Sequence, residues 1–289
     1  MLRIILLVLS CCHVCFAQET PLRLNFGVYP SDRATVMYRK FSPILDAIRV
    51  PLETKLKRDV DIHMTIFSDY QSGIEALANG EIDFVRFGPS SYIIAQELNP
   101  DIQLLAMELR KGLKRFNGLI IAHKDSKIQD ISDLKGKTFA FGDENSTIGR
   151  FLAQSLMADH GVSSENLESF DFLGRHDLVA KAVKTGTHDA GALKDSTYKK
   201  LCNPDEIIIV RAFANVTKPW VARSGLSKEI CDAITAALLI LDENEVVGEL
   251  GCSGFSKAIP KDYDLVRKGM KNAEAFTPKT EEEENNETD

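Results

Sequence analysis

The sequence predicts an α/β protein of two domains in which helices flank mixed sheets, and three observations support this. Its 289 residues are enough for two ordinary domains with substantial cores. Short stretches of alternating apolar residues are each followed by a longer stretch with helical spacing, which is the order of βαβ units. This order restarts after residue 112, so we expect it to be used once in each domain.

The first domain is predicted over residues 22–112 and again over 218–276. Its strands are expected at Leu22–Val28, Val60–Phe67, Ile82–Phe87 and Ile102–Leu109. Its helices are expected at Met37–Leu56, at Tyr70–Asn79 before Gly80, and from Ser90 onward. Pro51 is predicted to interrupt the first helix, because proline lacks the N–H that a helix interior needs. Residues 221–276 have mostly helical spacing and are too few for a third domain.

The second domain is predicted over residues 113–217. Its strands are expected at Leu119–Ala122, Lys137–Phe141, Asp189–Leu193 and Ile207–Val210. Its helices are expected at Ile148–His160, before Gly186 and at Tyr198–Leu201. Strands joined through a helix pair in parallel with right-handed crossovers, so we expect parallel pairing within these units.

Both ends of the chain have segments outside these domains. Arg3, the apolar run Ile4–Leu9 and Ala17 fit a secretory signal peptide over residues 1–17. A membrane span is one alternative, but the apolar run is shorter than the roughly 20 residues that a bilayer core requires, and a lipid anchor on Cys11 is the other. We therefore expect a periplasmic or secreted protein. Residues 277–289 form an acidic tail that cannot bury a core, and we expect it to be disordered.

The composition excludes some classes of function. A net charge of −7 argues against a nucleic-acid partner, although it does not exclude a small anion held locally. The histidines show no metal-ligand spacing, and we expect neither a metal nor a cofactor. Outside the signal peptide, Cys202, Cys231 and Cys252 allow either one disulfide with one free thiol or three buried thiols.

Two predicted strand-to-helix junctions carry glycine and hydroxyl residues. At Phe141–Gly149, the first turn of the helix offers unpaired N–H groups and a positive dipole end, while Ser146 and Thr147 add hydroxyl donors. The alternative is that Asn145 or Ser146 only caps the helix. A similar junction at Phe87–Tyr92 contains Ser90 and Ser91. Since ligands bind beyond the carboxyl ends of strands, the two junctions are predicted to face each other across a cleft.

These junctions and four further motifs resemble the phosphate, phosphite and phosphonate-binding proteins of ABC importers. The resemblance covers roughly residues 24–276 and is carried by the segments 76–83, 87–92, 133–143, 145–147, 174–177 and 189–192. It implies a type II periplasmic binding protein fold, with a ligand cleft between the two domains.

The resemblance also implies which residues contact the ligand. Ser146, Thr147 and His176 match the family's contacts to phosphonate oxygens, and Tyr70 and Phe87 match aromatic residues that line the cleft. Leu193–Ser196 replaces an asparagine-rich stretch of the family, so Lys194 and Asp195 are expected at the cleft together with Ser90 and Ser91. Arg86 either pairs with Asp83 or reaches the cleft.

The predicted function is therefore capture of a phosphorus oxyanion for an ABC transporter. A ligand-sensing partner of a membrane receptor is the first alternative, and an enzyme on the same fold is the second. The sequence shows no nucleophile with an adjacent base, so we expect no catalysis. We expect a monomer whose partners are the small anion and a membrane permease or sensor.

Overall fold

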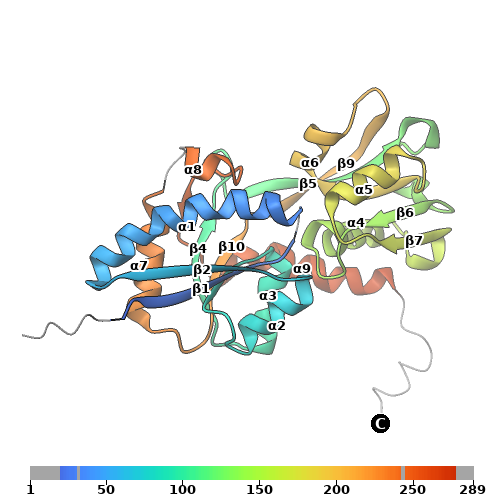
Figure 1. The fold of residues 1–289 in the computed structure, drawn as a ribbon. Coiled ribbons are helices and arrows are strands. Elements are labelled where there is room, and N and C mark those ends of the chain that lie inside the picture. Colours follow the sequence, from blue (N-terminus) through green and yellow to red (C-terminus); the bar gives the residue numbers. More distant parts are fainter. Residues whose placement is uncertain (1–19, 31–32, 242–244, 278–289) are drawn as a thin grey trace, which may run out of the picture.

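The computed structural model describes residues 20–30, 33–241 and 245–277. The predicted signal peptide, the candidate anchor Cys11 and the predicted tail from residue 278 onward lie outside the described residues. Two mixed sheets flanked by helices form two lobes, as the sequence predicts (Figure 1). No helix within the described ranges is long and apolar enough to cross a membrane.

The first sheet has the strand order β11-β4-β10-β3-β1-β2. Its strands are β1 (Leu22–Val28), β2 (Val60–Ile66), β3 (Phe84–Arg86), β4 (Gln103–Glu108), β10 (Pro219–Ala222) and β11 (Phe255–Ser256). Strand β1 is parallel to β2 and β3, as expected from the helical crossovers. Strand β10 is antiparallel to both of its neighbours, β3 and β4.

The second sheet has the strand order β7-β6-β8-β5-β9. Its strands are β5 (Arg115–His123), β6 (Thr138–Phe141), β7 (Ser169–Phe172), β8 (Ala190–Lys194) and β9 (Ile207–Val216). Strand β6 is parallel to β7 and β8, whereas β5 is antiparallel to β8 and β9. The expectation of parallel pairing therefore holds around β6 and is wrong at β5, because the segment between β5 and β6 contains only short 3-10 turns and no α-helix.

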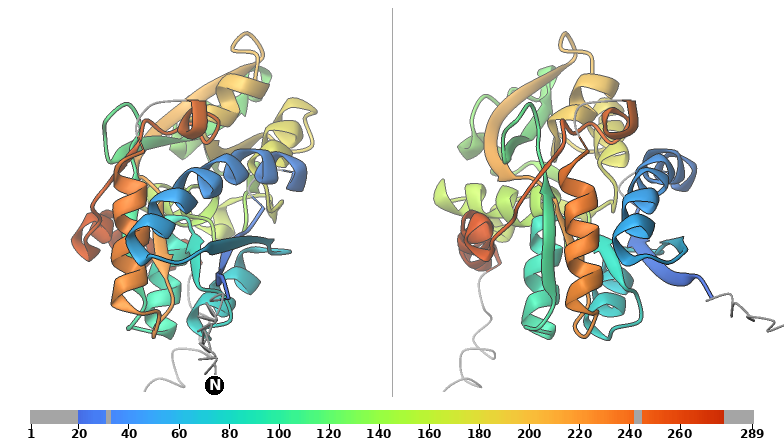
Figure 2. Two further views of the ribbon diagram at one scale, coloured as in Figure 1. Left: turned by 60° about the vertical axis from the view of Figure 1, so that its left-hand side comes forward. Right: turned by 90° about the vertical axis from the view of Figure 1, so that its left-hand side faces the viewer.

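Helices cover both faces of each sheet. They are α1 (Ala34–Leu56), α2 (Tyr70–Ala78), α3 (Pro89–Leu98), α4 (Leu152–Asp159), α5 (His176–Lys184), α6 (Asp195–Leu201), α7 (Lys228–Leu239), α8 (Glu245–Gly248) and α9 (Asp264–Ala273). Helices α1 and α7 pack side by side on one face of the first sheet (Figure 2). Helices α2 and α3 cover its other face. In the second sheet, α4 covers one face, and α5 and α6 cover the other.

Helix α1 continues through Pro43 and Pro51, so the predicted interruption at Pro51 is wrong. A proline inside a helix costs about 3 kcal/mol, and burial of one large apolar side chain contributes about 1.5 to 3 kcal/mol. The helix buries an apolar face against the first sheet that consists of Met37, Phe41, Ile44, Leu45, Ile48 and Leu52. The buried face outweighs the loss of two backbone hydrogen bonds.

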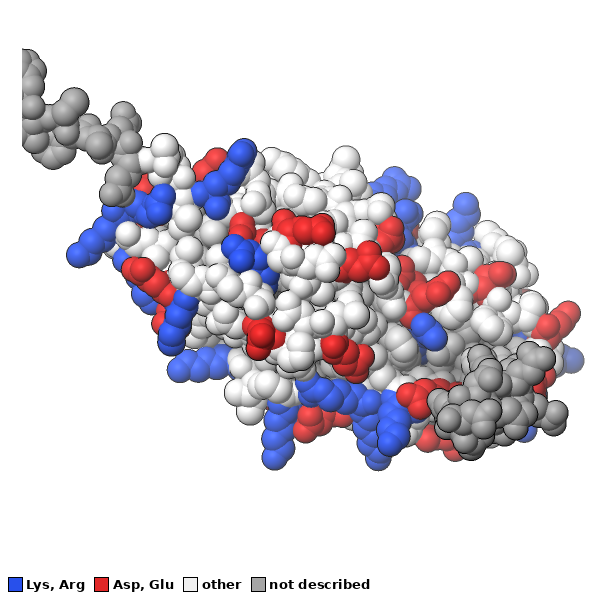
Figure 3. All heavy atoms as spheres, turned by 90° about the horizontal axis from the view of Figure 1, so that it is seen from below, with Lys and Arg blue, Asp and Glu red and all other residues white. Residues whose placement is uncertain are grey.

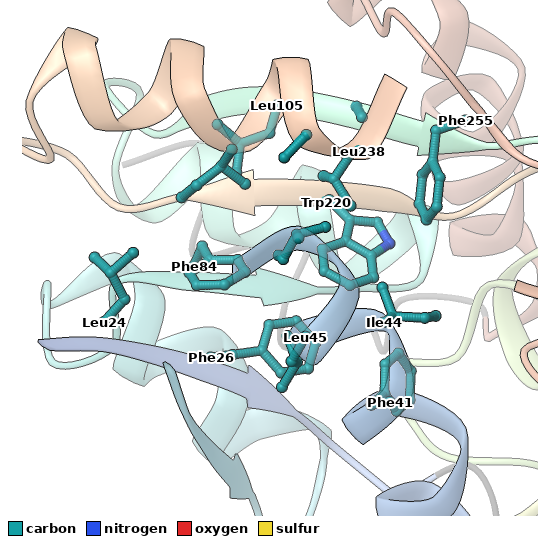
Figure 4. Close-up of a cluster of buried hydrophobic side chains, with 14 of the residues drawn as sticks. Leu24, Phe26, Phe41, Ile44, Leu45, Phe84, Leu105, Trp220, Leu238 and Phe255 are labelled. Atoms are coloured by element: carbon teal, nitrogen blue, oxygen red, sulfur yellow. The ribbon is translucent and has the colours of Figure 1, made fainter. Parts of the chain in front are cut away.

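Strand β10 lies in the centre of the first sheet and supplies the largest side chain of its core. Trp220 is fully buried and stacks on Phe26 with ring centroids 5.0 Å apart, next to Phe41 and Phe84 (Figure 4). The sequence did not predict this strand, and the expectation of helical structure over residues 221–276 is wrong at its start. Four residues beginning with proline show too little alternation to be recognised.

The chain passes from the first sheet to the second between β4 and β5 and returns between β9 and β10. The exact domain boundaries stay a prediction. Tyr263, just before α9, packs on Tyr92 of α3, whereas Phe276 packs on Phe141 and Phe170 of the second sheet. The last described segment therefore contacts the cores of both lobes.

The three cysteines within the described residues are free thiols. Cys231 and Cys252 are buried and Cys202 is half-buried. Burial raises the pKa of Cys252 to about 12, so its thiol is protonated and unreactive at neutral pH. Of the two alternatives from the sequence, this arrangement agrees with structural thiols.

Candidate functional site

The two glycine- and hydroxyl-containing junctions meet in the structure. The backbone N–H of Ser90, in the first turn of α3, donates to Thr147 Oγ1 at 2.9 Å. The hydroxyl of Ser90 donates to the carbonyl oxygen of Asn145 at 2.7 Å and lies 2.8 Å from Thr147 Oγ1. Asn145 Nδ2 also donates to Gln71 Oε1 at 3.0 Å. The junction of one lobe is thus directly hydrogen-bonded to the junction of the other.

The junction after β6 is held by short backbone contacts. Ser146 is the N-cap of a π-helical turn over Thr147–Phe151 that leads into α4, and its Oγ accepts from the N–H of Gly149 at 3.0 Å. The N–H of Gly142 donates to the carbonyl of Gly149 at 2.8 Å. A Cβ on Gly149 would lie 2.7 Å from Gly142 Cα, so only glycine fits there. Ser146 therefore caps the helix, and it also faces the cavity described next.

A small cavity of about 20 Å³ lies between the lobes at these junctions. Five of the residues predicted from the sequence line it: Tyr70, Ser146, Thr147, His176 and Lys194. They come from the starts of α2 and α5, from the π-helical turn before α4 and from the end of β8. Its other lining residues were not predicted as site residues: Gly88, Pro89, Phe116, Ile148, Asn215 and Lys218.

Tyr70 is positioned by Tyr29, a residue that the sequence did not single out. The two rings stack with centroids 3.7 Å apart, and both side chains are buried. The hydroxyl of Tyr29 accepts from the N–H of Gly88 and lies 2.9 Å from Ser91 Oγ. Burial raises the pKa of Tyr70 well above its ordinary value, and the nearby Tyr29 and Asp143 act in the same direction. Tyr70 is therefore neutral and can donate a hydrogen bond.

The other four predicted residues do not line this cavity. Phe87 is fully buried against Tyr29, with ring centroids 5.5 Å apart, and Ser91 is bonded to the same tyrosine. Ser90 is buried and bonded to the opposite junction. Asp195 is half-buried at the start of α6, and its Oδ2 accepts from Lys199 at 3.2 Å. Phe87 and Ser91 shape the junction, and Ser90 joins it to the other lobe.

Asn215 lies near the end of β9, and Lys218 lies in the segment that returns from β9 to β10. Burial lowers the pKa of Lys218 well below its ordinary value, and the positive charges of Arg86 and Lys194 lower it further. Asn215 is buried, and its Oδ1 accepts from the N–H of Val216 at 2.8 Å. No hydrogen bond within the described residues uses its Nδ2. No sequence motif marks either residue, because the returning chain brings them to the cavity.

A second, larger cavity of about 630 Å³ adjoins the first and shares Lys194 and Lys218 with it. Its lining contains two carboxylates, Asp177 and Glu249, and nine basic residues: Arg33, Lys40, Arg86, Arg110, Arg175, Lys181, Lys194, Lys200 and Lys218. On the outer face in Figure 3, by contrast, basic and acidic side chains are interspersed. The cavity lining is therefore strongly basic in a chain whose net charge is −7.

Arg86 at this cavity forms a buried ion pair with Glu108. Its Nε and Nη2 donate to the two carboxylate oxygens at 2.7 and 3.1 Å. Burial alone would raise the pKa of Glu108, but the charge and hydrogen bonds of Arg86 outweigh it, so the pKa lies below its ordinary value. Asp83 pairs instead with Arg223 at 3.0 Å. Of the two alternatives for Arg86, the structure excludes the pair with Asp83 and places Arg86 at the cleft.

Comparisons with known proteins show the family and the fold of this chain. The family model for the phosphonate ABC transporter's periplasmic substrate-binding protein matches residues 26–263. A probable ABC transporter phosphite-binding protein, PhnD1 of Prochlorococcus marinus, is 24% identical over 268 residues, which cover 85% of this chain and 88% of that protein. A phosphate-import protein, PhnD of Mycolicibacterium smegmatis, is 23% identical over 194 residues, 64% of this chain and 59% of that protein.

The solved structure of the Prochlorococcus protein, in complex with methylphosphonate, has a TM-score of 0.76 at 21% identity. It covers 89% of this chain and 100% of that chain. This likeness confirms the predicted type II periplasmic binding protein fold. The match of the family model confirms the resemblance that the sequence motifs predicted. This chain therefore belongs to the family of periplasmic substrate-binding proteins of phosphonate ABC transporters.

Proposed function

We propose that this protein captures a phosphonate, phosphite or phosphate ion in the small cavity between its lobes and delivers it to an ABC importer in the periplasm. The observation that carries the proposal is the convergence of side chains from both lobes on one cavity at two helix starts. Tyr70 of the first lobe, Thr147 and His176 of the second, and Lys218 between the lobes all line it. The related proteins named for phosphite and phosphate, and the one solved with methylphosphonate, support the choice of ligand class.

The number of donors is sufficient for tight binding. A dissociation constant near 1 μM needs about 8 kcal/mol, and a hydrogen bond to a charged group contributes about 1.5 to 3 kcal/mol, so about three to five donors are required. The side chains at the cavity that can donate are Tyr70, Ser146, Thr147, His176, Lys194, Asn215 and Lys218. First-turn N–H groups of the two helices add to them.

We infer that the lobes separate to admit the anion. The volume of the small cavity, about 20 Å³, is close to what one water molecule needs. A phosphonate ion is larger than this. The bonds from Ser90 to Thr147 close it. When the lobes part, the N–H and hydroxyl of Ser90 and the hydroxyl of Thr147 become available as donors. The ligand then replaces the direct contact between the junctions.

Calorimetric titration of the mature protein with phosphate, phosphite and methylphosphonate tests the proposal. A ligand at one hundred times its dissociation constant stabilises the folded form by about 2.7 kcal/mol, which corresponds to an increase in melting temperature of about 5 to 10 °C. We expect that increase with at least one of the three ions. The absence of binding and of a thermal shift with all three would exclude this ligand class.

Thr147→Val tests the contact at the second helix start. Valine keeps the shape of threonine and removes the hydroxyl, so the affinity for the ion that binds the parent protein should fall roughly tenfold to more than a hundredfold. Titration calorimetry of parent and variant with the same ion measures this loss. The control is Thr54→Val on α1, an exposed residue whose hydroxyl donates only to the carbonyl of Val50. Equal affinity of Thr147→Val and the parent would place the ion elsewhere.

A further inference from the structure

The larger cavity gathers positively charged side chains, and several of them lie outside the small cavity. Arg110, Lys181 and Lys200 line the larger cavity and do not line the small one. Arg110 is half-buried, with its guanidinium 5.3 Å from the ring centroid of Phe116, which itself lines the small cavity. The basic residues of the larger cavity therefore begin directly beside the predicted anion site.

Few negative groups balance this charge. Glu108 is already bonded to Arg86 through both oxygens, and Asp177 is bonded to Arg175 at 3.0 and 3.1 Å. Glu249, the other carboxylate of the lining, is exposed. No hydrogen bond within the described residues uses Nη1 of Arg86. Burial and then the charges of Arg86, Lys194 and Arg110 lower the pKa of Lys218, whereas the charge of Glu108 raises it. Like charges held together in a partly closed cavity raise the local potential for an anion.

We propose that the larger cavity binds a second anionic group of the same ligand. The preferred substrate class is then an organic phosphonate or phosphate ester that carries a carboxylate or a second phosphoryl group. This inference rests on the proposed function, because it places the first phosphoryl group in the small cavity. Lys194 and Lys218 line both cavities, so they lie between the two anionic groups and can contact either.

The volumes of the two cavities support a ligand of this kind. The small cavity of about 20 Å³ cannot hold the organic part of a ligand, whereas about 630 Å³ adjoins it. Pockets of about 300 to 1,000 Å³ are typical for small organic ligands. An alkyl chain alone would place no negative charge beside Arg110, Lys181 and Lys200. A chain that ends in a carboxylate or phosphoryl group pairs with them.

The test compares three phosphonates with the same three-carbon chain. Propylphosphonate ends in a methyl group, 3-phosphonopropionate in a carboxylate and 3-aminopropylphosphonate in an ammonium group. By calorimetric titration at constant salt, we expect 3-phosphonopropionate to bind tenfold to a hundredfold more tightly than propylphosphonate. The aminophosphonate should bind most weakly, because its ammonium group meets like charges.

Arg110→Gln locates the carboxylate. This variant should lower the ratio of the affinities for 3-phosphonopropionate and propylphosphonate at least threefold, and Lys200→Gln should lower it as well. Lys228→Gln is the matched control, because Lys228 is 83% exposed on α7 and pairs with Asp232. It should leave the ratio unchanged.

Each other outcome has a distinct meaning. Equal affinities of the parent protein for the carboxylate and methyl compounds would overturn the second subsite and leave the proposed function intact. A ratio that neither Arg110→Gln nor Lys200→Gln changes would exclude this cavity as the position of the carboxylate. If none of the three phosphonates binds, and neither phosphate nor phosphite does, the proposed function and this inference are both overturned.

Discussion

Glu108→Gln is expected to lower the melting temperature of the ligand-free protein by roughly 6 to 20 °C. Arg86 and Glu108 are 5% and 1% exposed, and two hydrogen bonds join them. Removing one partner of a buried ion pair leaves the other charge uncompensated and costs about 3 to 5 kcal/mol. In a protein of this size, each kcal/mol changes the melting temperature by about 2 to 4 °C. Calorimetric unfolding of parent and variant measures the change.

The matched control replaces a carboxylate in an exposed ion pair. Asp232 accepts from Lys228 at 2.6 Å on the surface of α7, where the two side chains are 54% and 83% exposed. Exposed pairs contribute about 0 to 1 kcal/mol, so Asp232→Asn should change the melting temperature by at most a few degrees. If Glu108→Gln changes it as little as this control, the buried pair is not a main support of the first lobe.

Lys218→Met is expected to weaken ligand binding and to stabilise the ligand-free protein. Loss of one partner of a buried charge pair costs about 2 to 5 kcal/mol, so the affinity for the bound ion should fall about 30-fold to more than 1,000-fold. The pKa of Lys218 is lowered in the folded protein, first by burial and then by Arg86 and Lys194. The folded state therefore binds this proton less well than the unfolded state, so the charged lysine costs stability at neutral pH.

Titration calorimetry and thermal unfolding of the same variant separate the two effects. Lys228→Met, at an exposed position, is the control and should leave ligand affinity unchanged. A Lys218→Met variant that binds weakly and also unfolds at a lower temperature would show that Lys218 supports the fold rather than the ligand.

The pH dependence of binding gives a further readout for Lys218. As the pH rises through the lowered pKa of Lys218, its ammonium group loses its charge and the affinity for the ion should decline. This decline should occur at a lower pH than for an ordinary lysine, whose pKa is about 10.4. The second ionisation of a phosphate monoester has a pKa of about 6, so it is complete at a pH well below this decline. Lys218→Met should remove the alkaline decline, and its persistence in the variant would assign the decline to another group.

The sequence by itself determined the local features of this protein. Alternation with a period of two residues predicted β1 and β2, and glycine stops predicted the ends of helices such as α2 and α5. The glycine and hydroxyl residues at Phe87–Tyr92 and Phe141–Gly149 predicted where the two lobes would meet. These features follow from backbone preferences of neighbouring residues, and such preferences can be recognised without knowledge of the rest of the fold.

Only the tertiary structure decided which side chains face the cavities. Phe87 and Ser91 lie at the predicted junction, but packing against Tyr29 turns both into the interior. Asn215, near the end of β9, and Lys218 reach the site because the chain returns to the first sheet between β9 and β10. Arg86 on β3 pairs with Glu108 on β4, although β10 lies between these two strands in the sheet. Contacts between residues distant in sequence depend on strand order and on the placement of one lobe against the other, and neither leaves a periodic pattern in the sequence.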